Sequence, residues 1–250
     1  QRLEHDRGPY LDPQAHEWPA NALRFGLLPY VPALLASPRS PAAWRCDIVH
    51  CNDWQTALAP AYLHWASDTA VPSLITIHNL AYQGIFPPET LAEVGLPRSS
   101  FDVNGVEFHG NLSFLKAGLY YAQRINTVSP TYAREIQSEP LGFGLHGLLA
   151  TRRNALDGIL NGIDVQTWDP TTDPWLAATY GSDCLERKAH NTRALRERFG
   201  LSPRPEQPLL GIVSRLIPQK GIDLMVQAAE GLTALPGQLV VLRTGHAGIE

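Results

Sequence analysis

The chain has 250 residues, of which 44% are hydrophobic and 18% charged, and its formal net charge is −4. This composition predicts a globular protein that holds one large domain or parts of two. The weak negative charge supplies no basic field for a polyanion, so we expect no nucleic-acid partner. No segment is apolar for long enough to span a bilayer, so no membrane partner is expected either.

The three cysteines, Cys46, Cys51 and Cys184, have no paired spacing and no C-x-x-C motif. This argues against a disulfide framework and against structural zinc. We expect each of them to be a small buried hydrophobic residue in a reducing compartment, the cytoplasm. The chain opens without an initiator Met or a secretory leader, which indicates that its start is missing.

The first half of the chain is expected to alternate strands and helices after an irregular start. Prolines and charges predict a loop over 1–20, and 21–36 should form helix in pieces, interrupted at Pro29 and Pro32. We predict strands at 46–50, 72–77 and 124–128, and helices at 54–66, 113–123 and from Pro130 onward. Asp53 and Ser129 are suited to cap two of these helices. The alternation with short loops predicts an α/β fold with parallel sheets.

The second half is expected to contain a charged helix and the beginning of a second sheet. A strand at 156–160 leads into the turn-prone Asn161–Asp164, and 167–174 is interpreted as a crossing segment between two units. A charged helix is predicted at 184–199. The pattern then predicts a strand at 209–213, a loop at 214–221, a helix at 222–229 and a strand at 239–242. The glycine-rich 143–149 permits no assignment.

Polar side chains gather at the predicted carboxyl ends of strands, which is where open α/β sheets bind ligands. The clusters are Asn52-Asp53-Trp54, His78-Asn79, Asn161 with Asp164, and Arg215 with Lys220. Two cations five positions apart, ahead of a predicted helix, would suit a diphosphate. Of 20 basic residues only three are Lys, and the other 17 are Arg, which favours Lys220 as a place for a compact ammonium group.

Each of these candidates also has a plainer interpretation. Arg215 and Lys220 would be solvated loop charges, and Asp53 a helix cap. His78 would be a hydrogen-bonded core histidine, Asn161 a turn residue, and Trp54 a core aromatic residue. The chain has no G-x-x-x-x-G-K-[ST] loop and no G-x-S-x-G elbow, and its one G-x-G-x-x-G match, at 142–147, does not follow a clear strand.

Seven ordered motifs identify a family, and the resemblance as a whole runs from about residue 6 to residue 242. They are 50–58 (HCNDWQTAL), 76–84 (TIHNLAYQG), 113–118 (SFLKAG), 127–133 (TVSPTYA), 160–164 (LNGID), 214–216 (SRL) and 219–221 (QKG). Together they resemble bacterial glycogen synthase and plant starch synthase, the ADP-glucose glucosyltransferases of glycosyltransferase family five.

The resemblance implies a fold of two Rossmann-like domains (GT-B type) with an active site between them and no metal or other cofactor. Residues 1–163 would be most of the acceptor-side domain, and 164–250 a linker and the first part of the nucleotide-sugar domain. The implied reaction transfers glucose from ADP-glucose to the non-reducing end of an α-1,4-glucan, glycogen or a maltooligosaccharide, with retention of configuration.

The resemblance also implies a role for each candidate residue. Arg215 and Lys220 would hold the diphosphate, His78 would face the glucosyl unit, and Asp53 would lie near the reacting sugar. The implied substrate-binding residues are Asn161, Asn79, Tyr10 and Trp54.

The chain departs from the family pattern at both ends. The K-x-G-G loop expected before Gln1 and the E-P-C-G-L motif expected after Glu250 are missing, and 243–246 (RTGH) differs from the usual glycine-rich sequence. We therefore expect an N-terminal domain without its start, a truncated C-terminal domain, and no synthase activity from these 250 residues alone. Two alternatives stay open: a non-catalytic glucan-binding remnant, and the same fold with UDP-glucose as donor or with phosphorolysis as its reaction.

Overall fold

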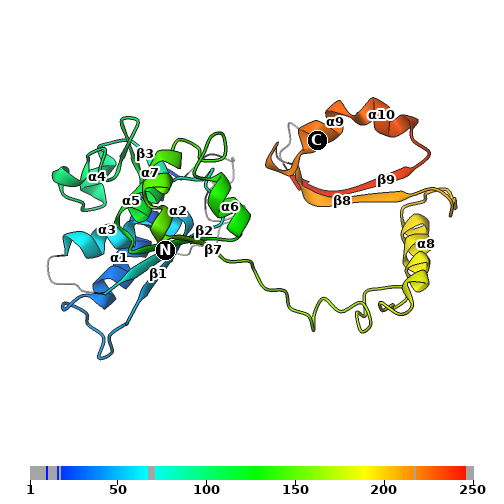
Figure 1. The fold of residues 1–250 in the computed structure, drawn as a ribbon, viewed down its shortest axis with the longest axis horizontal. Helices are drawn as coiled ribbons and strands as arrows, with labels where there is room; N and C mark the ends of the chain where they lie inside the picture. Colours follow the sequence, from blue (N-terminus) through cyan, green and yellow to red (C-terminus); the bar gives the residue numbers. More distant parts are fainter. Residues whose placement is uncertain (1–9, 11–15, 17, 67–70, 217, 246–250) are drawn as a thin grey trace. The chain divides into compact units, whose positions relative to one another are not determined.

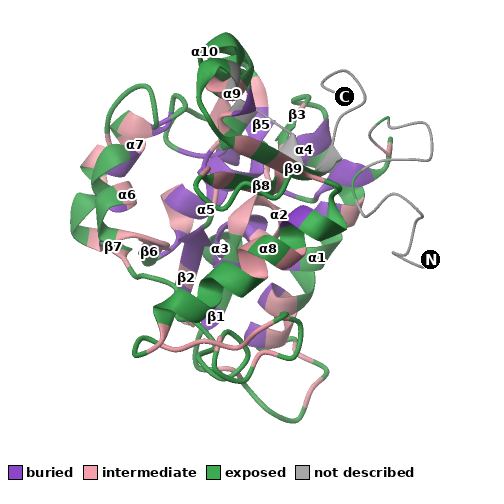
Figure 2. Cartoon of the chain, turned by 90° about the vertical axis from the view of Figure 1, so that its right-hand side faces the viewer, coloured by how far each residue is buried: buried purple, intermediate pink, exposed green. Residues whose placement is uncertain are grey.

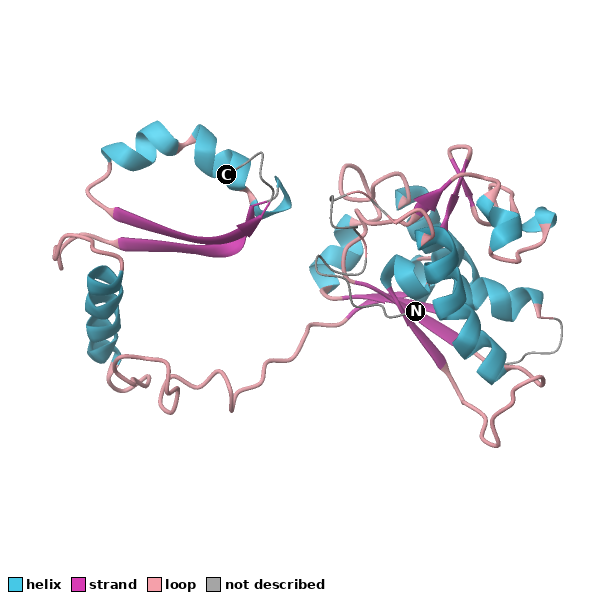
Figure 3. Ribbon diagram, turned by 180° about the vertical axis from the view of Figure 1, so that it is seen from behind, coloured by secondary structure: helices cyan, strands magenta, loops and turns pink. Residues whose placement is uncertain are grey.

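A computed structural model describes residues 10, 16, 18–66, 71–216 and 218–245, without the side chains of 215, 216, 218, 233 and 243–245. Most of the loop predicted over 1–20, and the divergent His246, lie outside the described residues. The chain divides into two compact units, Gln1–Gly162 (unit 1) and Ile163–Glu250 (unit 2). Figure 1 labels the helices and strands of each unit, and Figure 3 colours them by type.

Unit 1 is built on a parallel sheet of four strands in the order β1-β2-β6-β7. The strands are β1 (Val49–Asn52), β2 (Ser73–Ile77), β6 (Arg124–Thr127) and β7 (Leu156–Gly158). One register row joins Asn52, Thr76, Asn126 and Asp157 across all four strands. Because all four strands run in the same direction, their carboxyl ends meet at one edge of the sheet, where the predicted site residues follow.

Short helices and a small antiparallel sheet complete unit 1. The helices are α1 (Asn21–Ala36), α2 (Asp53–Thr56), α3 (Leu58–Trp65), α4 (Thr90–Glu93), α5 (Phe114–Tyr121), α6 (Pro130–Glu135) and α7 (His146–Thr151), with 3₁₀ turns η1 (Arg98–Ser100) and η2 (Arg153–Ala155). The small sheet pairs β3 (Ile85–Phe86) and β4 (Glu107–Phe108) with β5 (Asn111–Ser113) between them. Figure 1 shows α5 and α7 grouped on the same side of the parallel sheet.

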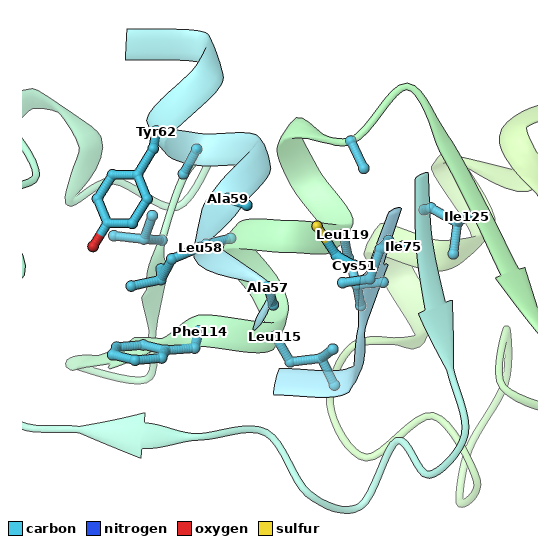
Figure 4. Close-up of a cluster of buried hydrophobic side chains, with 14 of the residues drawn as sticks. Cys51, Ala57, Leu58, Ala59, Tyr62, Ile75, Phe114, Leu115, Leu119 and Ile125 are labelled. Carbon is cyan, nitrogen blue, oxygen red and sulfur yellow. The ribbon is translucent and has the colours of Figure 1, made fainter. Parts of the chain in front are cut away.

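The core of unit 1 lies between the parallel sheet and the helices α3 and α5. Leu58 of α3, Phe114 and Leu119 of α5 and Ile75 of β2 are all fully buried, and Figure 4 shows them as members of one buried cluster. The close approach depends on Gly118, because a Cβ atom there would lie 2.5 Å from Cδ1 of Ile75. Buried apolar area of this kind is the main source of stability for the unit.

The opposite face of the sheet carries polar side chains that are joined by hydrogen bonds. In β1, Val49 and Cys51 are buried whereas His50 and Asn52 are exposed. The hydroxyl of Thr76 donates to Oδ1 of Asn126 at 2.6 Å, so it accepts from Nε2–H of His50 at 2.7 Å. One face of this parallel sheet is therefore polar and partly open, as the burial colours of Figure 2 also show for exposed parts of β1.

Unit 2 is built on a sheet of two strands and a few short helices. It contains η3 (Leu185–Arg187), α8 (Lys188–Arg198), β8 (Leu209–Leu216), η4 (Pro218–Lys220), α9 (Ile222–Gln227), α10 (Ala229–Ala234) and β9 (Gln238–Gly245). Strands β8 and β9 pair in parallel over their whole length. Arg196 of α8 is buried; its Nε donates to Oε1 of Gln238 at 2.8 Å and its guanidinium also bonds the carbonyl of Gln207. This arginine ties the helix to the start of β9.

Several sequence predictions are confirmed by these elements. The strands at 72–77 and 124–128 match β2 and β6 to within a residue. Ser129 caps α6, since its hydroxyl accepts from the backbone N–H groups of Thr131 and Tyr132, and Pro130 occupies the first helical position as expected. The predicted strand–helix–strand order of 209–242 is also present.

Other predictions are wrong about where a helix or strand begins, ends or is interrupted. Helix α1 continues through Pro29 and Pro32 because its buried face, including Phe25 and Ala33, packs into the core and offsets the lost backbone bonds. The strand predicted at 46–50 is β1, three residues later, where burial begins to alternate. The helices predicted at 54–66 and 222–229 are each broken in two, and β8 extends through the residues predicted as loop up to Leu216.

The cysteines follow the prediction only in part. All three are free thiols, and Cys51 is buried, which raises the pKa of its thiol to about 12 by desolvation. Cys46 and Cys184 are only half-buried, so full burial was wrong for them. Cys184 lies at a turn, where its sulfur accepts a hydrogen bond from the backbone N–H of Gly181.

Candidate functional site

Asp53 and His78 follow neighbouring parallel strands, and the structure brings them together. Oδ1 of Asp53 accepts the backbone N–H of His78 at 2.7 Å, and Oδ2 lies 3.0 Å from Nδ1 of the imidazole. The two contacts use both carboxylate oxygens and fix the ring of His78 relative to the end of β1. Asp53 therefore links the two strand ends.

This contact determines how the imidazole of His78 is presented. An ionised carboxylate only accepts hydrogen bonds, so Nδ1 carries a proton at the contact with Asp53. Nε2 is then the ring nitrogen left for another molecule. The side chain of His78 is 45% exposed, so it is not the buried core histidine of the plainer interpretation.

The prediction that Asp53 caps a helix is wrong. No side chain caps the N-terminus of α2, and the carboxylate of Asp53 is used by His78 instead. The backbone of Asp53 has φ 53°, in the left-handed region, which aspartate tolerates better than most residues. This local conformation turns the chain at the end of β1 and directs the carboxylate across to β2.

Tyr132 of α6 supports the segment that follows His78. Its hydroxyl accepts the backbone N–H of Leu80 at 3.1 Å. Burial raises the pKa of Tyr132; the hydrogen bond from Leu80 opposes this shift, while the negative charge of Asp53 adds to it. The motif containing Tyr132 was recognised from the sequence, but its contact with Leu80 depends on tertiary packing and had no local signal.

Trp54 is held within an aromatic cluster. Its ring meets Phe25 edge-on, with centroids 4.7 Å apart, and lies 6.0 Å from the ring of Phe86. A Cβ atom at Gly84 would lie 2.3 Å from Cε3 of Trp54, so glycine is required for this approach. The geometry favours the interpretation of Trp54 as a packed core aromatic residue that supports its neighbour Asp53.

Tyr10 lies over the same aromatic cluster. Its ring stacks on Phe25 with centroids 5.6 Å apart, and its hydroxyl accepts from Nε2 of Gln55 at 2.6 Å. Tyr10 is 41% exposed, so part of the residue remains accessible. Gln55 was not predicted as a site residue, although it follows Trp54 directly in the recognised motif.

The predicted asparagines occupy different settings. Oδ1 of Asn79 accepts the backbone N–H of Ala81 at 3.1 Å, which closes a local turn after His78. Asn161 is exposed, in a stretch without helix or strand. The turn expected over 161–164 comes later, since Asp164 accepts N–H bonds from Gln166 and Thr167. The bonds from Thr167 and Gln166 lower the pKa of Asp164.

The two predicted cations belong to unit 2. Arg215 lies in β8, where its backbone pairs with Thr244 of β9, and its side chain is outside the described residues. Lys220 ends η4 and is exposed, directly before Gly221 with φ 70°. Lys220 therefore lies between β8 and α9, as the sequence predicted, whereas Arg215 lies within β8 and not in the predicted loop.

The ammonium groups of the other two lysines, Lys116 and Lys188, contact other groups of the chain. Lys116 is buried, and its Nζ donates to the backbone carbonyl of Val103 at 2.8 Å and to that of Glu107. Desolvation lowers the pKa of Lys116, and the charges of Glu107 and Asp102 oppose this shift. Lys188 lies 5.7 Å from the ring centre of Tyr180. Lys116 thus fits the expectation that lysine is kept where a compact ammonium is needed.

Residues 1–151 match the family model described as the starch synthase catalytic domain. The chain belongs to this family. It is 54% identical over 245 residues to glycogen synthase of Nitrosospira multiformis, covering 98% of the chain and 49% of that relative. It is 56% identical over 243 residues to glycogen synthase of Nitrosomonas europaea, with 97% and 49% covered. The chain thus spans about half the length of the curated relatives it matches.

The fold agrees with this family. The chain is similar to a solved structure, the catalytic domain of starch synthase IV from Arabidopsis thaliana bound to ADP and acarbose, with a TM-score of 0.79 and 32% identity. The match covers 94% of this chain and 49% of that one. An α/β fold with parallel sheets, as predicted, is therefore confirmed for this starch synthase family member.

None of the helices in the described ranges has the length and apolar character that crossing a lipid bilayer requires. The same ranges contain no group of three or more His, Cys, Asp or Glu side chains that could hold a metal ion.

Proposed function

We propose that this chain is part of a glycogen or starch synthase that transfers glucose from ADP-glucose to the non-reducing end of an α-1,4-glucan with retention of configuration. The observation that carries the proposal is the Asp53–His78 pair at the shared edge of β1 and β2, in a member of the starch synthase family. The similar Arabidopsis structure with bound ADP and acarbose supports a nucleotide and a glucan as the ligand classes.

In this proposal the residues of unit 1 act on the sugar. Asp53 holds the imidazole of His78 so that Nε2 is directed to a hydroxyl of the glucosyl unit. Each carboxylate oxygen has two lone pairs, and the side chain of Asp53 is 27% exposed, so Asp53 can also accept a sugar hydroxyl. Asn79 and Tyr10 would add further contacts, and Trp54 would hold Tyr10 and Asp53 in place.

The residues of unit 2 would act on the leaving group. Breaking the bond between glucose C1 and the diphosphate leaves negative charge on the diphosphate oxygens. Arg215 and Lys220 would stabilise that charge, and Asn161, near the end of unit 1, would help to bind the donor. Removing one preorganised donor from such a site typically costs about 2.7–4 kcal/mol of barrier, whereas a solvated surface charge is worth about 0–1 kcal/mol. Mutation therefore distinguishes the two interpretations of Lys220.

The test uses a chimera in which this chain replaces the matching part of Nitrosomonas europaea glycogen synthase, to which it is 56% identical. We expect Lys220→Ala to lower kcat roughly a hundredfold or more with the fold intact. Lys188→Ala is the matched control, because Lys188 is also a lysine of unit 2 but lies against Tyr180. A Lys220→Ala rate within about threefold of the parent chimera, the effect of a surface charge, would remove Lys220 from the site.

We also propose that the 250 residues alone do not catalyse the transfer, because they span about half the length of the glycogen synthases they match. Binding measurements separate the proposal from its rivals. ADP binding to the chain that is lost on Lys220→Ala supports the enzyme, whereas binding of maltooligosaccharide without ADP supports a glucan-binding remnant. Incorporation of glucose into glycogen by the 250-residue chain would contradict its proposed inactivity, and preference of the chimera for UDP-glucose would contradict the donor.

A further inference from the structure

Thr56 closes a small hydrogen-bonded clamp at the end of β1. The backbone N–H of Asn52 donates to Oγ1 of Thr56 at 2.6 Å, and the same hydroxyl donates to the carbonyl of Asn52 at 2.8 Å. A hydroxyl can make both bonds, because it has one proton to donate and lone pairs to accept with. Asn52 is extended, with φ −129° and ψ 120°, so its N–H and C=O point to the same side.

The Thr56 hydroxyl bonds backbone groups of Asn52 that a neighbouring strand would otherwise bond. β1 pairs with β2 on one edge only, and the N–H of Val49 bonds toward β2, to Pro72. Because backbone groups alternate along a strand, those of Asn52, three residues later, point to the outer edge of β1. There the hydroxyl of Thr56 satisfies both groups, so the strand ends at Asn52 and Asp53 begins the turn.

The next residue, Asp53, depends on what holds Asn52. A non-glycine residue in the left-handed region is strained and persists where surrounding contacts determine its conformation. On one side of Asp53 the contacts are the Asn52–Thr56 clamp, and on the other are the two hydrogen bonds that its carboxylate accepts from His78. The clamp and the His78 contacts therefore fix the same backbone turn from both ends.

We propose that Thr56 is a positioning residue that, through Asn52 and Asp53, sets the tautomer and orientation of His78. Its link to glucosyl transfer rests on the proposed function, but its effect on His78 does not. Without the hydroxyl, water can bond the Asn52 backbone, and Asp53 is free to return to an ordinary φ. The carboxylate then loses its contact with Nδ1, and the imidazole no longer holds its proton on that nitrogen.

The direct test is the ¹⁵N NMR spectrum of the His78 ring in the full 250-residue chain, at a pH where the ring is neutral. We expect the parent to show a protonated Nδ1 and an unprotonated Nε2. Thr56→Val keeps the shape of the side chain but removes the hydroxyl, and we expect the two nitrogen shifts to move toward each other as tautomers mix. Thr56→Ser keeps the hydroxyl and should restore the parent spectrum.

The matched control is Thr151→Val in α7. Thr151 donates to the carbonyl of Leu148 at 2.7 Å, a similar local bond in the same unit that does not involve Asp53. It should leave the His78 shifts unchanged, and the methyl signals of Ile75 and Ile125 report whether the core of each variant is intact. Parent-like His78 shifts in Thr56→Val, or no restoration by Thr56→Ser, would overturn the proposal.

Kinetics of the chimera then connect the clamp to the reaction. Thr56→Val should lower kcat roughly tenfold or more, because misplacing a catalytic group by about 1 Å can cost as much as a hundredfold, while the KM for the donor stays unchanged. Thr56→Ser should recover the rate. If the parent chimera is inactive, the proposed function fails, whereas the NMR result still decides the role of Thr56. An active chimera whose kcat is unaffected by Thr56→Val contradicts the catalytic link.

Discussion

The two units of this chain bury their apolar side chains to very different extents. Among the described residues, unit 1 buries a large cluster of hydrophobic side chains, whereas Ile222 is the buried hydrophobic residue of unit 2. Apolar side chains on both β8 and α9 stay open, with Val213 79% and Leu224 64% exposed. A sheet of two strands is marginal without an apolar face to pack on. The packed core of unit 1 can thus hold the Asp53–His78 pair rigidly. Arg215 and Lys220 belong to unit 2, whose two-stranded sheet has little buried apolar area.

The largest expected contrast is between two phenylalanines. Phe114 is fully buried in unit 1, whereas Phe199 of unit 2 is 45% exposed. Phe114→Ala should reduce the free energy of unfolding of unit 1 by about 3–5 kcal/mol, because it leaves a cavity in the core. Phe199→Ala should cost unit 2 less than about 1 kcal/mol. Urea unfolding followed by tryptophan fluorescence measures both, and equal losses would contradict the contrast.

Polar contacts should matter more than apolar ones in unit 2. Arg196→Ala removes charged hydrogen bonds to Gln238 and Gln207 and leaves their oxygens without that donor. Hydrogen bonds to charged groups are worth about 1.5–3 kcal/mol, so we expect a loss of that size. Arg193→Ala on the same helix is the control for helix propensity. Hydrogen exchange at β9 amides reports the result, and unchanged protection in Arg196→Ala would show that the hydrogen bonds of Arg196 are dispensable.

Substituting two glycines, Gly84 and Gly95, separates the packing of Trp54 from the backbone cost of a left-handed residue. Gly84 and Gly95 both have positive φ, 59° and 72°, but only Gly84 has a close neighbour, with Cε3 of Trp54 2.3 Å from its would-be Cβ. Each Gly→Ala change carries the left-handed backbone cost, and Gly84→Ala should lose a further 1–3 kcal/mol, roughly, from overpacking. Thermal unfolding of the two variants gives the difference. Equal Tm values would mean that the indole moves aside freely.

The smallest expected effect is a pH dependence. Burial raises the pKa of Cys51 from 9.0 to about 12, so between these values the unfolded chain loses a proton that the folded chain keeps. Stability from this thiol is fully present below pH 9 and falls as the pH rises toward 12. Cys51→Ala should reduce that slope by at most about 1.4 kcal/mol per pH unit. Denaturation curves between pH 8 and 10.5 check this, and an unchanged slope would contradict it.

Prediction from the sequence succeeded where local chemistry determines structure. The serine–proline pair at 129–130 specified the start of α6, since its hydroxyl and fixed φ act within one turn. Strand β2 was found because its run of apolar residues is bounded by Pro72 and His78. Helix α1 was mistaken because the cost of Pro29 is local, whereas the packing that offsets it involves residues distant in sequence.

In the candidate site, too, some features could be predicted from the sequence and others were decided by the tertiary structure. Order and identity of the motifs specified the family, the α/β fold and the candidates Asp53 and His78, because those features are written in residue types and spacing. Only the tertiary structure decided that the carboxylate of Asp53 bonds His78 instead of capping α2, and that Thr56 holds Asn52. The reason is physical: a side chain has several possible partners along its own chain, and the pairing of β1 with β2 selects the one it bonds.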